Sequence, residues 1–249
     1  MRILLTNDDG IQAVGLRALY KALVAAGNEV HVVAPVTEQS AVGHAITIAS
    51  PLRVREFREE GFFGLGVTGT PADCVKIAVT TLLPQRPDMV VSGINAGPNV
   101  GVDIMYSGTV SAATEGALMG FPALAASMDD HNPTDLSGQA GYAADLLARL
   151  PLSRLPERCV LNLNFPNRPI EKALPLALCP HTRVPWTDWY EERLDPRGRK
   201  YYWMCGELRH EKVSPGRDRL LLSAGHVTMT PLKFDFTDHD TLAALEPLL

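Results

Sequence analysis

Short apolar runs alternate with longer segments of mixed polarity along the first two thirds of the chain. The apolar runs are continuous, which is typical of strands buried on both faces of a parallel sheet. Strands that alternate with helices of this length predict an α/β fold, in which a mostly parallel sheet carries helices on both faces. The predicted strands cover residues 2–6, 29–35, 88–95, 121–127 and 159–166. The predicted helices cover residues 14–26, 70–82, 108–120 and 135–150.

The residues beyond about 167 have a different character. All three tryptophans lie here, and the stretch 186–203 mixes aromatic and charged residues. Four acidic side chains balance four basic ones within it, so it is not the basic patch that single-stranded nucleic acid requires. Because Trp, Tyr and Arg are enriched at interfaces, we predict an extended arm or hairpin that contacts another subunit. Partial alternation over 226–236 and a short helix in the last ten residues complete this β-rich extension.

The domain organisation predicted from this change has two parts. Residues 1–166 form the α/β core. Residues 167–249 form the C-terminal oligomerisation arm, together with the closing strands and helix of the same domain. A chain of 249 residues suits one large domain, or one domain with an appendage.

Composition and charge exclude several classes of partner. The formal charge of −5 gives no broad attraction to nucleic acid or anionic lipid, so neither is expected as a partner. No apolar run approaches the roughly 18 residues of a membrane helix, and the one at the amino terminus is too short for a secretory signal. We therefore expect a cytoplasmic location by default. The four cysteines are widely spaced, which favours reduced structural thiols over a zinc site or a disulfide framework.

Polar side chains follow three of the predicted strands. Asp8 and Asp9 come directly after the first strand, Ser40 follows the second, and Asn95 ends the strand 88–95. Taken alone, Asp-Asp-Gly is most often a turn, a loop serine is usually solvated or capping, and Asn95 is typical of a bend. However, ligands bind parallel sheets at the carboxyl ends of the strands, so the four side chains are expected at one edge. Two carboxylates, an amide and a hydroxyl suit one Mg²⁺ or Mn²⁺ ion, with Ca²⁺ as a further candidate.

A fourth polar loop precedes the helix predicted over 108–120. Ser107, Gly108 and Thr109 stand at its amino terminus, where free N–H groups and the helix dipole favour an anion. Ordinary helix capping by the hydroxyls is the alternative. An anion site next to a divalent cation is typical of sites that hydrolyse phosphate esters. A Walker-type phosphate loop does not occur in the sequence.

These loops also resemble the signature blocks of a known family. The segments MRILLTNDDG, VVAPVTEQSAVGHAIT, GTPADCV, VSGINAGPNVG and YSGTVSAATEG are similar, in order, to blocks of the SurE family of 5′/3′-nucleotidases, and DPRGRKYYW resembles a further block. The resemblance implies a Rossmann-like core and dimers or tetramers built partly by exchange of the C-terminal arm. It implies a divalent metal on Asp8, Asp9, Ser40 and Asn95, and a phosphate pocket near Ser107, Gly108 and Thr109. Many members carry a basic residue just before the metal-binding serine, where this chain has VTEQS.

The function expected is hydrolysis of a nucleoside 5′-monophosphate, or also a 3′-monophosphate, to nucleoside and phosphate. Asp8 and Asp9 are the expected catalytic residues, and Asn95 is expected to contact substrate as well as metal. His44 is a candidate acid for the leaving group, although a solvated loop histidine is the more usual interpretation. The alternative function is a non-catalytic nucleotide-binding or metal-binding oligomeric module. An oxidoreductase is disfavoured because no GxGxxG follows the first strand.

Overall fold

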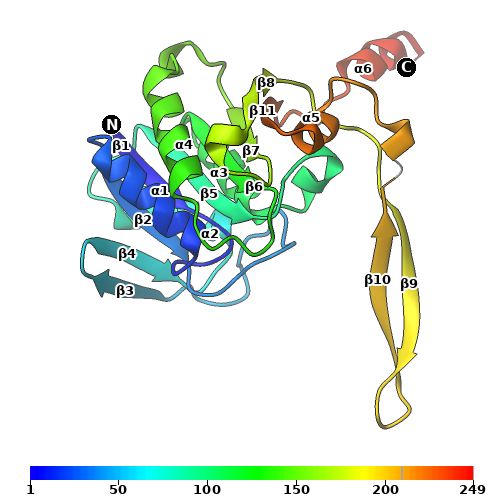
Figure 1. Cartoon of the computed structure of the whole chain (residues 1–249), viewed down its shortest axis with the longest axis horizontal. Coiled ribbons are helices and arrows are strands. Elements are labelled where there is room, and N and C mark those ends of the chain that lie inside the picture. The colour runs from blue at the N-terminus through cyan, green and yellow to red at the C-terminus, as the bar shows by residue number, and fades with distance from the viewer. Residues whose placement is uncertain (209, 249) are drawn as a thin grey trace.

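A nine-stranded sheet forms the centre of the molecule, shown in the computed structural model of Figure 1, which describes residues 1–208 and 210–248. The strand order is β3-β4-β2-β1-β5-β6-β7-β11-β8. The strands are β1 (Arg2–Thr6), β2 (Glu29–Pro35), β3 (Val54–Glu59), β4 (Phe62–Val67), β5 (Met89–Ala96), β6 (Ala123–Met128), β7 (Cys159–Phe165), β8 (Leu174–Leu178) and β11 (His226–Lys233).

The sheet is mostly parallel, which confirms the predicted α/β class. Strand β1 pairs in parallel with β2 on one side and with β5 on the other. Only β3 with β4 and β7 with β11 pair antiparallel among the described strands of this sheet. The carboxyl ends of β1, β2 and β5 therefore open onto one edge, where the predicted site residues lie.

Helices cover both faces of this sheet, as predicted. Alternate residues of a strand point to opposite faces. Ile3 and Leu5 of β1 pack with α1 and α4, whereas Leu4 packs with α2 and α3. The helices are α1 (Val14–Ala25), α2 (Pro71–Ile77), α3 (Gly108–Leu118), α4 (Ser137–Arg149), α5 (Asp218–Ala224) and α6 (His239–Leu245). A π-helical turn (Ala78–Leu82) extends α2, and 3₁₀ turns cover Gly101–Met105, Leu152–Arg154, Ile170–Lys172, His210–Lys212 and Glu246–Leu248.

Four elements have no counterpart among the predictions: β3, β4, β8 and α5. Strand β3 (VREFRE) is charged and largely exposed at the sheet edge, so it lacks the apolar run that marks the buried strands. Strand β4 carries two glycines, which weaken a strand pattern. At Gly66, an added Cβ would lie 2.4 Å from the ring of Phe57 on β3, so that glycine allows the two strands to pack.

The predicted arm is a long β-hairpin that projects from the body of the molecule (Figure 1). Strands β9 (Thr187–Leu194) and β10 (Lys200–Glu207) pair antiparallel with each other and lie outside the main sheet. The side chains of β9 are all exposed. At the tip, Asp195 accepts hydrogen bonds from the backbone N–H groups of Arg197 and Arg199. The C-terminal helix α6 buries none of its described side chains either.

None of the helices described for residues 1–208 and 210–248 has the length and apolar character needed to cross a bilayer.

Candidate functional site: two aspartates at a helix amino terminus

Asp8 and Asp9 lie in a tight turn at the carboxyl end of β1. The Asn7 amide donates to the carbonyl of Gly10 at 2.9 Å, and Gly10 has a φ of +100°, so the turn chemistry of the sequence is present. Asp8 is 5% exposed. Asp9 accepts a hydrogen bond from the backbone N–H of Ala96 at 3.1 Å. This bond ties the second aspartate to the end of the neighbouring strand β5.

The amino terminus of α3 lies directly on Asp8. The Thr109 hydroxyl donates to the Asp8 carboxylate. A Cβ added at Gly108 would lie 2.7 Å from the Cβ of Asp8, so a residue with a side chain does not fit there without movement. Ser107 is the N-cap of the helix, because its Oγ accepts from Val110 N–H at 3.1 Å. The structure thus brings the predicted anion loop to the first aspartate, and it also confirms that Ser107 caps the helix.

Negative charge on the aspartate pair is poorly compensated by the surrounding protein. Burial raises the pKa of Asp8, against the opposing effect of the Thr109 hydrogen bond. Burial, and then the charge of Asp8, raise the pKa of Asp9 to about 7, although the Ala96 N–H acts in the other direction. The carboxylate of Glu38, which the sequence reasoning did not single out, adds to the rise for both. A bound cation would relieve this repulsion.

Ser40, in the loop after β2, and Asn95, near the carboxyl end of β5, lie at the same edge. The loop of Ser40 is held on Asp8 by a hydrogen bond from the Gln39 N–H to the Asp8 carbonyl at 2.8 Å. Ser40 is exposed, and its hydroxyl donates to Glu38 at 2.5 Å. The amide nitrogen of Asn95 donates to the Gly97 carbonyl at 2.7 Å. Because this nitrogen is used, the amide oxygen is the Asn95 atom left for a cation or a substrate.

The donor types at this edge fit a hard divalent cation. Over the described residues 1–208 and 210–248, no group of three or more His, Cys, Asp or Glu side chains is arranged to hold a metal ion. Asp8, Asp9, Ser40 and Asn95 offer a mixed set of carboxylate, hydroxyl and amide oxygens. Such sets suit Mg²⁺, Mn²⁺ or Ca²⁺, and Mg²⁺ usually keeps several waters besides its protein ligands.

His44 is exposed in a loop, as the usual interpretation expects, and its ring is also paired with a carboxylate. Its Nε2 lies 2.8 Å from Glu115 on α3, and Lys76 of α2 donates to the same carboxylate at 2.6 Å. Burial acts to raise the pKa of Glu115, but the hydrogen bonds from His44 and Lys76 outweigh it and hold the pKa below its ordinary value. The pair is separated by 71 residues in sequence, so no local pattern signalled it.

The C-terminal part of the chain holds the loop that leads into α3. Asp218 is almost fully buried and accepts from the N–H of Gly101 at 2.7 Å and from the N–H of Thr182 at 2.7 Å. Arg219 forms an ion pair with Asp103, which lies in the 3₁₀ turn just before Ser107. No local pattern in the sequence signals the contacts of Asp218 with Gly101 and of Arg219 with Asp103, because more than 100 residues separate the partners.

The comparisons with known proteins show the family of this chain. The family model described as survival protein SurE matches residues 3–188. The chain belongs to the SurE family. It is 64% identical to a protein of Maridesulfovibrio salexigens named 5′-nucleotidase SurE, over 99% of this chain and 98% of that one. A protein of the same name from Solidesulfovibrio magneticus is also 64% identical, over 98% and 96% of the two chains.

A solved structure shows the same fold within the SurE family. The crystal structure of the SurE protein of Aquifex aeolicus is 34% identical to this chain and has a TM-score of 0.85. The match covers 100% of this chain and 99% of that one. The C-terminal extension beyond residue 188 is thus part of the shared structure.

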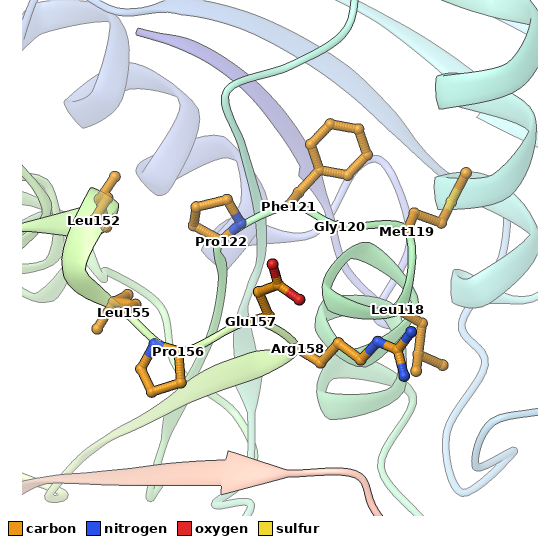
Figure 2. A pocket seen from close by; sticks show the side chains of 10 residues that line it. All are labelled: Leu118, Met119, Gly120, Phe121, Pro122, Leu152, Leu155, Pro156, Glu157 and Arg158. Atoms are coloured by element: carbon orange, nitrogen blue, oxygen red, sulfur yellow. The ribbon is translucent and has the colours of Figure 1, made fainter.

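A large cavity of this SurE-family chain lies far along α3 from the aspartates. Figure 2 shows it between the residues that end α3 and those around the 3₁₀ turn Leu152–Arg154, with a volume of about 400 Å³. Among the described residues that line it, only Glu157 and Arg158 are charged. Asp8 contacts the opposite, amino-terminal end of α3, so this cavity is separate from the candidate site.

Proposed function

We propose that this protein is a divalent-metal-dependent phosphomonoesterase that hydrolyses nucleoside 5′-monophosphates, and also 3′-monophosphates, to nucleoside and phosphate. The observation that carries the proposal is the contact of the α3 amino terminus with Asp8. It supports a phosphate site at this helix end, next to a cation held by the oxygen-rich edge. The name 5′-nucleotidase, borne by relatives that match over nearly the whole chain, supports the same reaction.

Asp8, Asp9, Ser40 and Asn95 would hold one Mg²⁺ or Mn²⁺ ion, with Ca²⁺ as an alternative. When bound, such an ion neutralises charge on a phosphoryl oxygen and acidifies a coordinated water. The ion would thus supply the charge neutralisation and the acidified water that the side chains lack.

The remaining phosphate oxygens would be held by the start of α3. The N–H groups of the first helical residues have no partner within the helix, and the helix dipole adds partial positive charge. Gly108 and Thr109 are such residues, and Ser107 orders them by capping the helix. Asn95 would add a substrate contact in which its amide oxygen accepts a hydrogen bond from a substrate hydroxyl.

Asp9 is the better placed of the two aspartates to take the proton of the attacking water. One oxygen of Asp8 accepts from Thr109, and a Cβ at Gly108 would lie 2.8 Å from the other. Asp9 accepts from Ala96 through one oxygen, so its second oxygen is more accessible. Asp8 would then serve mainly to hold the metal.

The arm would join copies of this chain into a homodimer or a homotetramer. Strands β9 and β10 expose large aromatic side chains, among them Trp189, Tyr190 and Trp203. Such residues are frequent at interfaces. With its formal charge of −5, the protein would act in the cytoplasm on small nucleotides, without nucleic acid or membrane as a partner.

The deciding experiment is phosphate release from a panel of nucleoside monophosphates. Protein treated with a chelator is compared with protein supplied with Mg²⁺ or Mn²⁺, and Asp9→Asn is run beside it. Metal-dependent release that collapses in Asp9→Asn supports the proposal. Folded protein that binds a nucleotide but releases no phosphate with any metal would support the alternative, a non-catalytic nucleotide-binding or metal-binding module.

A further inference from the structure

A smaller cavity lies directly beside the aspartate pair. It has a volume of about 210 Å³, and Asp9 forms part of its wall. The other walls come from the start of α1, the end of β5 and the loop after β6. The lining residues are Asp9, Ala13, Val14, Gly15, Ile94, Ala96, His131, Asn132 and Pro133.

The wall between α1 and β5 is closely packed. A Cβ added at Gly15 would lie 1.8 Å from the carbonyl oxygen of Ile94, so α1 rests directly on the end of β5. This contact leaves small and apolar groups at the base of the cavity. They suit the face of a ring rather than a second charged group.

The opposite wall is the loop after β6, which is anchored at its start. Its first residue, Asp129, donates from its N–H to the carbonyl of Phe165 at 2.9 Å. Asp130 accepts from the N–H of Asn132 at 2.9 Å within the loop. The ring of His131 lies against Gly97, where an added Cβ would be 2.8 Å from two ring atoms. An imidazole and an amide therefore line the cavity across from Asp9.

The two sides of the aspartate pair are thus chemically different. The Asp8 side is occupied by the amino terminus of α3, which suits phosphate. The Asp9 side opens onto a cavity with a ring-bearing wall. A phosphomonoester whose phosphoryl group lies at α3 must extend its organic part away from that helix, and Asp9, the neighbour of Asp8 in the chain, lines a cavity that would receive it.

We propose that this cavity receives the base of the substrate, and that His131 is the residue that contacts it and favours nucleotides over other phosphomonoesters. The inference rests on the proposed function. The volume lies below the roughly 300 Å³ at the lower end for pockets that enclose a whole small ligand, so the cavity takes one ring system. The His131 ring stacks on the base, and Asn132 supplies a polar contact at its edge.

The test compares two phosphomonoesters that differ in the organic part. Kinetics with adenosine 5′-monophosphate and with glycerol 2-phosphate are measured for the metal-loaded wild type, for His131→Ala and for His31→Ala. His131 is exposed, so its replacement leaves the core intact. His31 on β2 is the matched control, because its ring contacts Glu29 at 2.9 Å and does not line the cavity.

We expect His131→Ala to lower kcat/KM for adenosine 5′-monophosphate by about tenfold or more, and for glycerol 2-phosphate by less than about twofold. Inhibition by adenosine should weaken, whereas inhibition by inorganic phosphate should not. Equal falls for both substrates, or no change for either, would overturn the assignment while leaving the phosphomonoesterase intact. A wild type that hydrolyses neither substrate would remove the proposed function and this inference with it.

Discussion

The indole Nε1 of Trp186 donates a hydrogen bond to the Asp103 carboxylate at 2.6 Å. Trp186 is the last residue before strand β9, and Asp103 lies in the 3₁₀ turn that precedes Ser107. Arg219 holds the same turn through Asp103 and through the Val100 carbonyl. The root of the arm is therefore linked to the loop that carries the proposed phosphate site.

Trp186→Phe should weaken phosphate binding more than it affects chemistry. The variant keeps an aromatic ring but loses the donor, so Asp103 and the turn before α3 become less fixed. We expect KM for a nucleoside monophosphate to rise by about threefold to tenfold, with kcat changed by less than about twofold. Steady-state kinetics and the inhibition constant of inorganic phosphate measure this.

The control for that variant is Trp189→Phe, in the middle of β9. Trp189 pairs with Cys205 of β10 within the hairpin and is half-exposed. If the arm root acts through Asp103, Trp189→Phe leaves KM unchanged. The same rise in KM for both variants would contradict a specific role for Trp186.

Asp9→Asn should abolish metal-dependent hydrolysis and at the same time stabilise the metal-free protein at neutral pH. The pKa of Asp9 is raised to about 7 by burial and by Asp8, so the folded state binds a proton that the unfolded state has already released. Wild-type stability attributable to Asp9 therefore falls as pH rises from about 4 to about 7, and stays low above that. The asparagine carries no charge and avoids this loss.

Urea unfolding tests whether the free energy of unfolding changes with pH in this direction. It is measured at several pH values for wild type and Asp9→Asn, both treated with a chelator. We expect the variant to gain roughly 1–3 kcal/mol relative to wild type between pH 4 and pH 8. A difference that is constant across this range would show that the Asp9 charge is not the cause.

The sequence predicted the parts of the site that lie close to strand ends. The apolar runs before Asp8, Asp9 and Asn95 are typical of buried strands. Parallel pairing of these strands then brings the three residues to one edge. The loop of Ser107 was found because capping residues and glycine stand before a helix. Each of these signals is local in the sequence, and the parallel sheet then brings the residues together.

Other contributors carry no such signal. Glu38 lies in a polar loop. Its charge raises the pKa of the two aspartates only because the fold brings it near them. His131 packs on Gly97, which leaves room for its ring, and Asp218 accepts hydrogen bonds from two segments that are distant from it in sequence. Strand β3 was missed for a related reason, since a charged edge strand is defined by its partner β4 and not by its own hydrophobicity.

Asp73→Asn should destabilise the protein at neutral pH and have little effect in acid. Asp73 accepts hydrogen bonds from the N–H groups of Thr47 at 3.0 Å and of Thr70 at 2.9 Å. Burial acts to raise its pKa, but these hydrogen bonds outweigh it and leave the pKa below its ordinary value. A lowered pKa stabilises the fold above the unfolded value, and the stabilisation is lost as pH falls through the folded pKa.

The free energy of unfolding of Asp73→Asn and wild type, compared at pH 7 and near pH 3, measures this. We expect a cost of roughly 1–2 kcal/mol at pH 7, typical of a lost helix cap, and a much smaller one in acid. An equal cost at both pH values would assign the effect to packing and not to the carboxylate charge.

Gly108→Ala should reduce metal affinity, although alanine is the better helix former. The exchange would favour the helix by up to about 1 kcal/mol on propensity alone. However, the new Cβ would lie 2.7 Å from Asp8 Cβ and 2.8 Å from Asp8 Oδ2, so the aspartate must move. Because Asp8 is expected to hold the metal, calorimetric titration with Mn²⁺ should show affinity lower by about tenfold or more, with hydrolysis falling in parallel.

Gly116→Ala in the same helix provides the matched comparison. There the added Cβ would lie 2.6 Å from Val90 Cβ, in the core and away from the aspartates. Overpacking of this kind typically costs about 1–3 kcal/mol of stability. We therefore expect Gly116→Ala to lower the melting temperature but to bind Mn²⁺ as the wild type does. If both alanine variants lost stability and metal affinity to the same extent, the close approach of Gly108 to Asp8 would be a packing feature of α3 rather than a requirement of the metal site.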